Sequence, residues 1–501
     1  MIKFGEYAPD QPALDSGGMF STVAQNTVPL TKTSYGPVSA LVTSSNALSA
    51  RCQGAASFRD KAGNAYSFAG DASKLYSLTT ETWGDVSIAA GYTTDDHETV
   101  EFAKFGERVI SVNGINDPMQ TYSLGGGGPF ANLASAAPRA RHIAQIKDFI
   151  MVLNTFDSTD GENPSRLWWS AIDDPTDWPT IGSADAAQKQ SDYQTLPSGG
   201  WGQALIGAVG GVDGAAVMDG AIYRIVYEGT PSIFGFYEVE RDRGTPAPNS
   251  VINIGDFAAY LGQEGFYIFN GQDSTPIGDQ RVDRTFLADL NQSLFHLVIG
   301  AADVLNKRFW WIYPSTGNSV PNKAIVYNWA IDRWSHAEFD SEFIFRDHAQ
   351  GETLETLDTN YGTNIDSASV YGFSFDSRIY TGGRPLLGFF DNTHKLATQT
   401  GDSLAAVIES QEIGGKSRIF VSGVQPYVDA DDTDDITIKL KYRDTPGTTV
   451  TTGSAADIDS DGSAHFTQSA RYVRAEVTVA ASASWNHAQG VDADISDDGG
   501  V

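Results

Sequence analysis

Two adjacent tryptophans, Trp168 and Trp169, constrain the fold of this chain more than any other feature. They lie in "RLWWSAIDDPTDWP", residues 166–179. Neighbouring side chains on a strand point to opposite faces, and an amphipathic helix or a strand with one wet face buries only one of two adjacent residues. The segment is therefore predicted to need apolar cover on both faces.

Similar aromatic segments recur through the middle of the chain. Their aromatic residues are Tyr76, Tyr122, Trp168, Tyr223, Tyr267 and Trp311, at intervals of 46, 46, 55, 44 and 44 residues. A period near 45 in a chain rich in turn residues is typical of one four-stranded propeller blade per repeat. Because blades stack face to face around an axis, their strands are covered on both sides. We predict an all-β chain with a β-propeller of six or seven blades, whose core contains Trp168, Trp169, Trp310 and Trp311.

The rest of the chain is also predicted to be mainly β. Helical periodicity is convincing only in "DRTFLADLNQSLFHL", where Phe286, Leu287, Leu290 and Leu294 share a face. Near the end, "ITIKLKYR" and "RYVRAEVTV" alternate apolar and polar residues, as strands with one wet face do. This pattern predicts a β-sandwich-like domain.

Three regions follow from these patterns. Residues 1–45 are predicted to be an extended arm, because Pro9, Pro12, Pro29 and Pro37 discourage regular structure, and we expect the arm to pair with a late blade and close the ring. Residues 46–400 are predicted to form the propeller, and residues 401–501 the sandwich-like domain, which ends in a mobile acidic tail, "DADISDDGGV". Acidity concentrates in residues 424–501, which hold 14 acidic residues and 5 Lys or Arg.

Composition limits the classes of function. The formal net charge of −30 argues against a protein that grips nucleic acid by its phosphates, since Lys and Arg make that grip. Solubility alone is an alternative reason for the acidity. The single cysteine, Cys52, excludes an intramolecular disulfide and an all-cysteine metal site. Neither a signal peptide nor an apolar run of ~18 residues is present, so we expect a soluble protein made in a cytoplasm, with no membrane span.

Signals for catalysis are weak. The eight histidines are scattered without an HExxH pair, and "LGGGGP", residues 124–129, lacks the Gly-Lys-Ser/Thr of a phosphate-binding loop. No Gly-x-Ser-x-Gly elbow is present. We therefore predict no catalytic residue, no cofactor and no enzymatic activity. A propeller glycosidase remains an alternative, because paired carboxylates roughly 5 to 10 Å apart would serve it and the sequence has many acids.

One acidic turn resembles the start of a calcium loop. Asp457, Asp459, Asp461 and Gly462 match its opening, in which alternate oxygens surround the ion. The twelfth position is Gln468 instead of a bidentate Glu, and strands are expected on both sides. An ordinary acidic hairpin turn is the competing interpretation.

Several segments, taken in their order along the chain, resemble those of a known protein family. These segments are "PDQPAL", "RLWWSAIDDPTDW", "YRIVYEGTPSIFGF", "GFYIFNG", "RFWWIYP" followed by "AIVYNWAIDRWS", "GFFDNTHKLATQTG" and "RYVRAEVTVAASASWNHAQGVD". In this order, across nearly the whole chain, they resemble the tail nozzle, or packaged-DNA stabilisation, proteins of short-tailed bacteriophages. The family has no catalytic residues to carry over.

The resemblance implies a structural subunit of the virion, assembled in the cytoplasm of the bacterial host. Such a subunit would form a homo-hexameric ring below the portal and its adaptor, contact tail fibre or tail needle proteins, and help to retain the packaged genome. Double-stranded DNA would pass through the ring without tight binding. A carbohydrate-active enzyme and a sugar-binding tail component are the alternatives, since exposed aromatic residues also stack on sugars.

Overall fold

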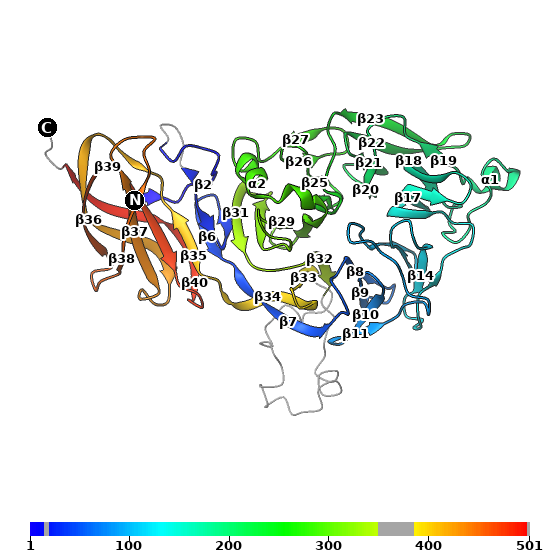
Figure 1. The fold of residues 1–501 in the computed structure, drawn as a ribbon, viewed down its shortest axis with the longest axis horizontal. Helices are drawn as coiled ribbons and strands as arrows, with labels where there is room; N and C mark the ends of the chain where they lie inside the picture. Colours follow the sequence, from blue (N-terminus) through cyan, green and yellow to red (C-terminus); the bar gives the residue numbers. More distant parts are fainter. Residues whose placement is uncertain (15–19, 349–384, 498–501) are drawn as a thin grey trace, which may run out of the picture.

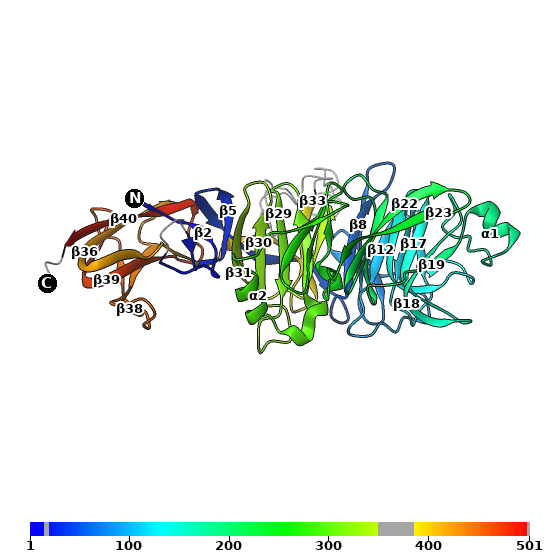
Figure 2. The same ribbon diagram turned by 90° about the horizontal axis from the view of Figure 1, so that it is seen from above.

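The structure, a computed structural model, describes residues 1–14, 20–348 and 385–497. Figure 1 shows a ring of β-sheets at one end of the molecule and a C-terminal β-domain at the other, with the N-terminal segment between them. Figure 2 shows the same arrangement with the ring turned edge-on. The predicted fold class, an all-β chain built around a β-propeller, is confirmed.

Six separate four-stranded sheets form blades of the propeller in the described part of the chain. Five of them are antiparallel meanders, in which each strand pairs with the next. These are β8 (Gly54–Arg59), β9 (Ala65–Gly70), β10 (Leu75–Thr79) and β11 (Thr82–Asp85); β12 (Glu101–Phe105), β13 (Arg108–Val112), β14 (Gln120–Ser123) and β15 (Ala131–Asn132); β16 (Arg139–Ile146), β17 (Phe149–Asp157), β18 (Gly161–Trp169) and β19 (Tyr193–Thr195); β20 (Gly202–Ile206), β21 (Gly214–Met218), β22 (Ala221–Gly229) and β23 (Ile233–Arg241); and β24 (Ile252–Asn253), β25 (Ala258–Leu261), β26 (Phe266–Phe269) and β27 (Ser274–Pro276).

The sixth separate sheet closes the ring with distant parts of the chain. It contains β32 (Phe343–His348), β33 (Pro385–Phe390), β34 (Lys395–Ser403) and, from the arm, β7 (Ser39–Ala47). Strand β7 runs antiparallel to β34, with Ala47 opposite Lys395 and Ser39 opposite Ser403. Strand β32 contacts β8 of the first blade. The arm therefore pairs with a late blade, as the sequence predicts.

A further meander occupies the place of a seventh blade. It consists of β28 (Ile299–Asp303), β29 (Arg308–Tyr313), β30 (Lys323–Asn328) and β31 (Arg333–Glu338). Its inner strand β28 contacts β24 on one side and β32 on the other. This meander is not a separate sheet, because the sheet continues beyond β31 into the C-terminal domain.

The apolar core of the propeller lies between neighbouring blades, and the adjacent tryptophans of β18 show why. Trp168 is partly buried against a cluster that includes Ile110 of the preceding blade. Trp169 is buried on the other face, where its ring lies 5.2 Å from that of Phe234 of the following blade. Each tryptophan therefore covers a different face of one strand.

Trp310 and Trp311 on β29 repeat this arrangement. Both are buried. The ring of Trp310 lies 6.4 Å from that of Phe389 on β33, and the ring of Trp311 lies 4.7 Å from that of Phe266 on β26. The pair thus packs the meander β28–β31 against the blades on both sides.

The aromatic period marks one particular strand of each blade. Tyr76, Tyr122, Trp168, Tyr223 and Tyr267 all lie on the third strand of a blade: β10, β14, β18, β22 and β26. Trp311, however, lies on a second strand, and Tyr327 on β30 holds the equivalent position. The period of about 45 residues therefore no longer reaches the third strand, because α2 (Asp283–Asp289) and the 3₁₀ helix η2 (Gln292–Leu297) are inserted before β28.

The predicted helical segment is thus broken into two short helices. Leu290 ends α2 with an extended backbone, at φ −64° and ψ 135°. Phe286 and Leu290 are buried, while Leu287 and Leu294 are partly exposed. One continuous apolar face does not form, because the chain changes direction at Leu290.

The four prolines discourage regular structure in residues 1–45 but do not exclude it. They contain β1 (Ile2–Lys3), β2 (Glu6–Tyr7), β3 (Phe20–Ser21), β4 (Ala24–Gln25), β5 (Thr27–Thr31), β6 (Ser34–Pro37) and most of β7. Pro29 is tolerated in β5 because β5 is the outermost strand of its sheet, where an N–H is not needed on the open side. Pro9 and Pro12 lie outside the strands.

The C-terminal domain is built from β35 (Ala406–Glu409), β36 (Ile413–Ala430), β37 (Ile436–Arg443), β38 (Thr451–Asp457), β39 (Ala464–Val479) and β40 (Trp485–Asp497). Strand β39 pairs with β36 along its first half and with β37 along its second half. Shared long strands of this kind let one sheet turn back on itself. The predicted one-sided burial is confirmed, since Ile436, Ile438, Leu440, Val473, Ala475, Val477 and Val479 are all buried. The last four residues of the predicted acidic tail, 498–501, lie outside the described residues.

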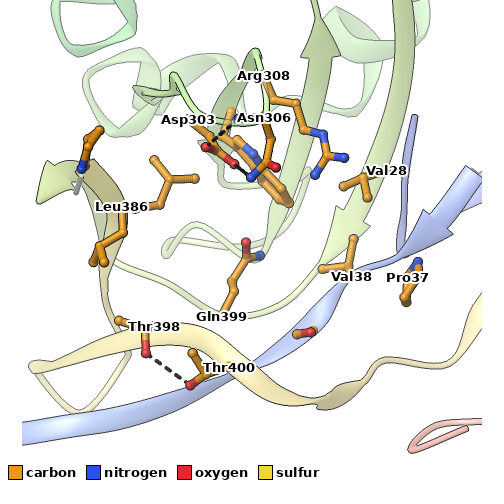
Figure 3. Close-up of a pocket in the computed structure, with 14 residues that line it drawn as sticks. Val28, Pro37, Val38, Asp303, Asn306, Arg308, Leu386, Thr398, Gln399 and Thr400 are labelled. Carbon is orange, nitrogen blue, oxygen red and sulfur yellow. Dashed lines mark hydrogen bonds between the residues drawn. The ribbon is translucent and has the colours of Figure 1, made fainter. Parts of the chain in front are cut away.

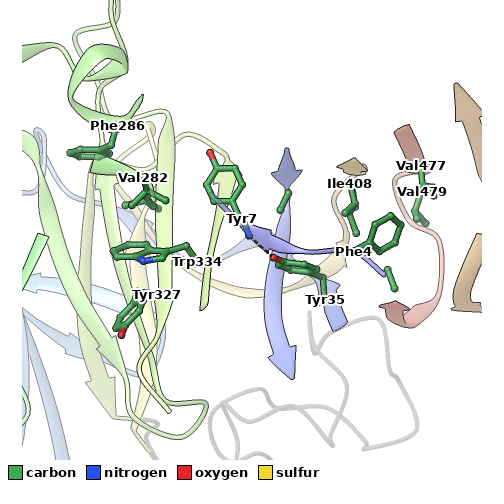
Figure 4. Packing of buried hydrophobic residues seen from close by; sticks show 14 of the residues in the cluster. Phe4, Tyr7, Tyr35, Val282, Phe286, Tyr327, Trp334, Ile408, Val477 and Val479 are labelled. Carbon is green, nitrogen blue, oxygen red and sulfur yellow. Dashed lines mark hydrogen bonds between the residues drawn. The ribbon is translucent and has the colours of Figure 1, made fainter. Parts of the chain in front are cut away.

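Strands from the arm also belong to the C-terminal sheet. β1 and β6 pair with β40, and β4 pairs with both β35 and β31. A single sheet therefore runs from β28 through β4 to β40. Figure 4 shows Tyr7 and Tyr35 of the arm between Trp334 of β31 and Ile408 of β35. The cores of the two domains are continuous through the arm.

Candidate functional site

The propeller encloses a cavity of about 330 Å³ around its axis. Its walls are the inner strands β8, β12, β20, β24, β28 and β32, together with the turn η1 (Pro248–Ser250). Most lining residues are small or apolar, and the charged ones are Glu101 and Arg346. The inner strands supply this lining because every second residue of a strand points away from the blade core.

Side-chain contacts cross the propeller axis at one end of this cavity. His97 precedes β12 and His296 precedes β28, and their ring nitrogens Nδ1 and Nε2 lie 3.3 Å apart. Beside them Thr99 donates to Asn249 Oδ1 at 2.9 Å, and the Asn249 amide donates to the His296 carbonyl at 2.8 Å. The two sides belong to blades on opposite parts of the ring. These contacts obstruct the propeller axis at this end.

Burial controls the charge of the pair. Desolvation, followed by the neighbouring His97, lowers the pKa of His296 to about 4. His296 is therefore neutral at pH 7, so two charged imidazoles do not face each other at this contact.

An exposed tryptophan lies between the third and fourth blades. Trp201, immediately before β20, is 54% exposed. The Arg141 guanidinium lies 5.9 Å from the centre of its ring and forms ion pairs with Glu98 at 3.1 Å and Glu162 at 2.5 Å. Burial raises the pKa of Glu98 although Arg141 lies beside it. An exposed ring with planar polar groups beside it can contact a protein or a sugar.

Sequence reasoning missed Trp201. The sequence signal for an exposed side chain was its position in "SGGWGQ", between glycines at a turn. The adjacent tryptophan pairs, in contrast, lie inside strand patterns. The backbone N–H of Trp201 donates to Asp219 Oδ2 at 2.9 Å, and this hydrogen bond fixes the backbone of the turn. The aromatic side chain is left at the surface.

The acidic triplet forms a turn between β38 and β39. Asp461 Oδ1 accepts the Ser463 N–H at 3.0 Å, and Oδ2 lies 3.0 Å from His465 Nε2. The Gly462 N–H donates to the Asp459 carbonyl at 2.8 Å. Within residues 1–14, 20–348 and 385–497, no three His, Cys, Asp or Glu side chains are grouped so that they could hold a metal ion. Asp457, Asp459 and Asp461 are therefore not brought together as calcium ligands, and the arrangement is that of a hairpin turn.

The structure places the other residues considered from the sequence as follows. The glycine run 125–128 is a turn between β14 and β15, within a blade. His142 contacts Glu101 at 2.7 Å, and His394 contacts Glu342 at 2.8 Å. Cys52 is buried, and its N–H donates to Glu342. No helix in the described chain is long and apolar enough to cross a membrane.

Comparisons with known proteins find similarity in three-dimensional structure only. No family model matches the sequence, and no curated protein matches it. Among solved structures, the chain is similar to the WD40 domain of Pan2 from Neurospora crassa, with 9% identity and a TM-score of 0.36 over 69% of this chain and 88% of that one. It is also similar to AztD from Citrobacter koseri, with 12% identity and a TM-score of 0.30 over 57% of this chain and 86% of that one. A protein from Lactobacillus plantarum is similar at 12% identity and a TM-score of 0.33, over 55% of this chain and 81% of that one.

Proposed function

We propose that this chain is a structural subunit of the tail nozzle of a short-tailed bacteriophage. In this proposal six copies form a ring below the portal and its adaptor, retain the packaged genome and guide its ejection. The observation that carries the proposal is the sheet that joins β28–β31 to the C-terminal domain through the arm. A subunit that withstands the pressure of a packaged genome requires domains that do not move apart.

Partly buried ion pairs reinforce this junction. Glu6 of the arm pairs with Arg333 at 3.1 Å and also with Arg281. At the C-terminal side, Glu409 accepts a hydrogen bond from Thr22 at 2.8 Å and pairs with Arg474 at 3.3 Å. Removing one member of such a buried pair leaves an uncompensated charge. The arm is therefore fixed to both domains.

The obstructed propeller axis favours a DNA path outside the single subunit. His97, His296 and Asn249 cross that axis, and duplex DNA is too wide for a cavity of about 330 Å³. DNA would pass through the channel between six subunits. Their formal charge at pH 7, six times −30, would repel phosphate over a Debye length of about 8 Å and centre the duplex without binding it.

A sugar-binding tail component is the second candidate function, and Trp201 is the observation that favours it. The ring is exposed, Arg141 lies against it and pairs with Glu162, and Asp219 accepts the backbone N–H of Trp201. If this is the function, Trp201→Ala abolishes binding of the particle to host glycans and leaves the tail assembled. In a nozzle subunit the same variant leaves glycan binding unchanged.

Reconstruction of the parent particle by electron cryo-microscopy tests the proposal directly. We expect six copies in a closed cyclic ring, about 323 kDa or six times the 53.8 kDa subunit, between the adaptor and the tail tip. Five copies, twelve copies, or a position away from the tail axis would contradict it.

A further inference from the structure

The cavity around the propeller axis, here called the axial cavity, has the size and lining of a site for a small organic molecule. Its volume of about 330 Å³ lies at the lower end of the range of about 300–1,000 Å³ that is typical of ligand pockets. The lining is mainly apolar, and it includes several of the smallest residues: Ala55, Ala56, Gly300, Ala301 and Ala302. Such a cavity holds the apolar part of a ligand, and the few polar groups around it determine which ligands it accepts.

Arg346 supplies the positive charge of this lining. It lies on β32, its side chain is exposed, and it forms no ion pair within the described chain. Two further cations lie on the next two inner strands: Arg59 ends β8, and Lys104, near the end of β12, donates to the Arg59 carbonyl. Neither of them has a carboxylate partner in residues 1–14, 20–348 and 385–497, where the buried Nε–H of Arg59 also has no acceptor. Positive charge therefore gathers at this end of the axial cavity.

The acidic side chains nearby are directed to other partners. Glu101 also lines the cavity, but its Oε1 lies 2.7 Å from His142 Nδ1 and its Oε2 accepts the Ile143 N–H at 3.0 Å. Its carboxylate is therefore directed to β16. Asp60 and Glu107, in the adjoining hairpins, accept backbone N–H groups of those turns at 2.9 and 3.1 Å.

The effect of these charges is seen at His348. Desolvation first, and then the charges of Arg59 and Arg346, lower the pKa of His348 to about 4. The potential at this end of the axis is thus positive, although the net charge of the chain is −30. The other end of the cavity is obstructed by the contact between His97 and His296. An anionic group would therefore lie at the Arg346 end.

We propose that the axial cavity binds a small amphipathic anion, a molecule with an apolar body and one carboxylate. The apolar body fills the space between the inner strands. The carboxylate accepts hydrogen bonds from the guanidinium of Arg346, whose parallel N–H groups match two carboxylate oxygens. Because β8, β12, β20, β24, β28 and β32 all line the cavity, the bound molecule contacts most of the blades and stabilises the closed ring. The site does not depend on the proposed function.

A smaller cavity, where the ring of blades closes, differs in its charges (Figure 3). It has a volume of about 190 Å³ and lies between Val28 and Val38 of the arm, the meander β28–β31 and Gln399 of β34. Arg308 and Asp303 line it together, so its charges do not favour an anion. This cavity serves as an internal control for the position of the site.

Calorimetric titration of the full chain with hexanoate, hexanol and hexylamine tests the proposal, because the three probes share a six-carbon chain and differ in their head group. At matched ionic strength we expect saturable binding of hexanoate at millimolar or lower concentration. Hexanol should bind at least tenfold more weakly, because it lacks the charge-assisted hydrogen bonds, and hexylamine should not bind measurably. Heptanoate should bind about fourfold more tightly than hexanoate, since it buries one more CH₂. Equal affinity for hexanoate and hexanol, or no saturable binding of hexanoate, overturns the proposal.

Variants locate the site. Arg346→Gln removes the charge and is expected to weaken hexanoate binding at least tenfold while hexanol binding stays unchanged. Ala56→Leu fills part of the cavity and is expected to weaken the binding of both probes. If Ala56→Leu fails to fold, Arg346→Gln decides the matter, because the Arg346 side chain is exposed.

Two control variants complete the test. Arg284→Gln makes the same change of charge at an exposed arginine of α2 that has no ion pair in the described chain and does not line the axial cavity. Gln399→Leu alters the smaller cavity instead. Both are expected to bind hexanoate as the wild type does. Unchanged hexanoate affinity in Arg346→Gln, or an equal loss in either control, would contradict the assignment.

Discussion

Asp283 is the residue at which burial and charge conflict most clearly. Its side chain is buried at the start of α2, and its Oδ1 accepts the Phe266 N–H at 3.1 Å. Gly265 and Gly278 pack directly against the carboxyl group, where any Cβ would lie 2.0 Å from it. Desolvation, with a contribution from the negative charge of Asp10, raises the pKa of Asp283 to about 7.

This raised pKa predicts a pH-dependent loss of stability. The folded state holds the proton up to about pH 7, whereas the unfolded state releases it near the ordinary value of 3.8. The contribution of Asp283 to the free energy of unfolding is thus complete below pH 3.8 and is lost as pH rises to 7. Asp283→Asn, which cannot ionise, is expected to be more stable than wild type by a few kcal/mol at pH 8 and by only about 1 kcal/mol at pH 4.5. Urea denaturation at the two pH values measures this.

Asp256→Asn is the matched control, because Asp256 lies at an exposed turn of the blade β24–β27, which Asp283 contacts through Phe266. It is expected to shift stability little, and equally at both pH values. If Asp283→Asn also produces the same offset at pH 4.5 and pH 8, Asp283 is ionised in the folded protein throughout this range.

At the scale of elements, the arm performs two separable tasks. Strand β7 completes the last blade, while β1, β4 and β6 extend the C-terminal sheet. Deleting residues 1–38 removes the second task and keeps β7. Deleting residues 1–48 removes both, and leaves β34 as an open edge whose backbone groups have lost their partners.

We therefore expect the two truncations to differ in the propeller. The chain lacking residues 1–38 should keep a cooperative propeller transition in scanning calorimetry and lose stability in the C-terminal domain. The chain lacking residues 1–48 should also lose the propeller transition or aggregate. Equal propeller stability in both chains would mean that β7 is dispensable for closure.

The elements also show how far the sequence could predict the structure. The aromatic period identified the third strands of five blades because inter-blade packing demands a large residue there, and alternation identified the buried face of β37 and β39. The strands of the arm carry no such periodicity, since most are short and several, such as β1 and β4, obtain partners from residues hundreds of positions away. The arrangement of Asp457, Asp459 and Asp461, and the exposure of Trp201, depend on the direction in which each side chain points. Residue spacing in the sequence does not determine that direction.

For the whole molecule, charge and surface together predict the absence of DNA binding. A net charge of −30 repels phosphate, and the arginines that the structure places in ion pairs, such as Arg141, Arg166, Arg281 and Arg333, are already matched by carboxylates. We expect no measurable binding of duplex DNA by the isolated protein at physiological salt in fluorescence anisotropy.

A basic surface would give a different result. Submicromolar binding that weakens steeply as salt increases would show that Lys and Arg gather on one face and displace counterions from the phosphates. In that case the proposed repulsive channel is wrong, even if the chain is a nozzle subunit. A known basic DNA-binding domain of similar size serves as the positive control.

The pairing of β7 with β34 cannot form until most of the chain has been synthesised. Ala47 and its partner Lys395 are separated by 348 residues, so at about 5–20 residues per second the first strand waits roughly 17–70 s before its partner has been translated. During this interval β7 is an unpaired edge that a neighbouring nascent chain could capture. Its sequence, "SALVTSSNA", contains five Ser, Thr or Asn residues among nine, and such low hydrophobicity limits that capture while the ribosome completes the other blades.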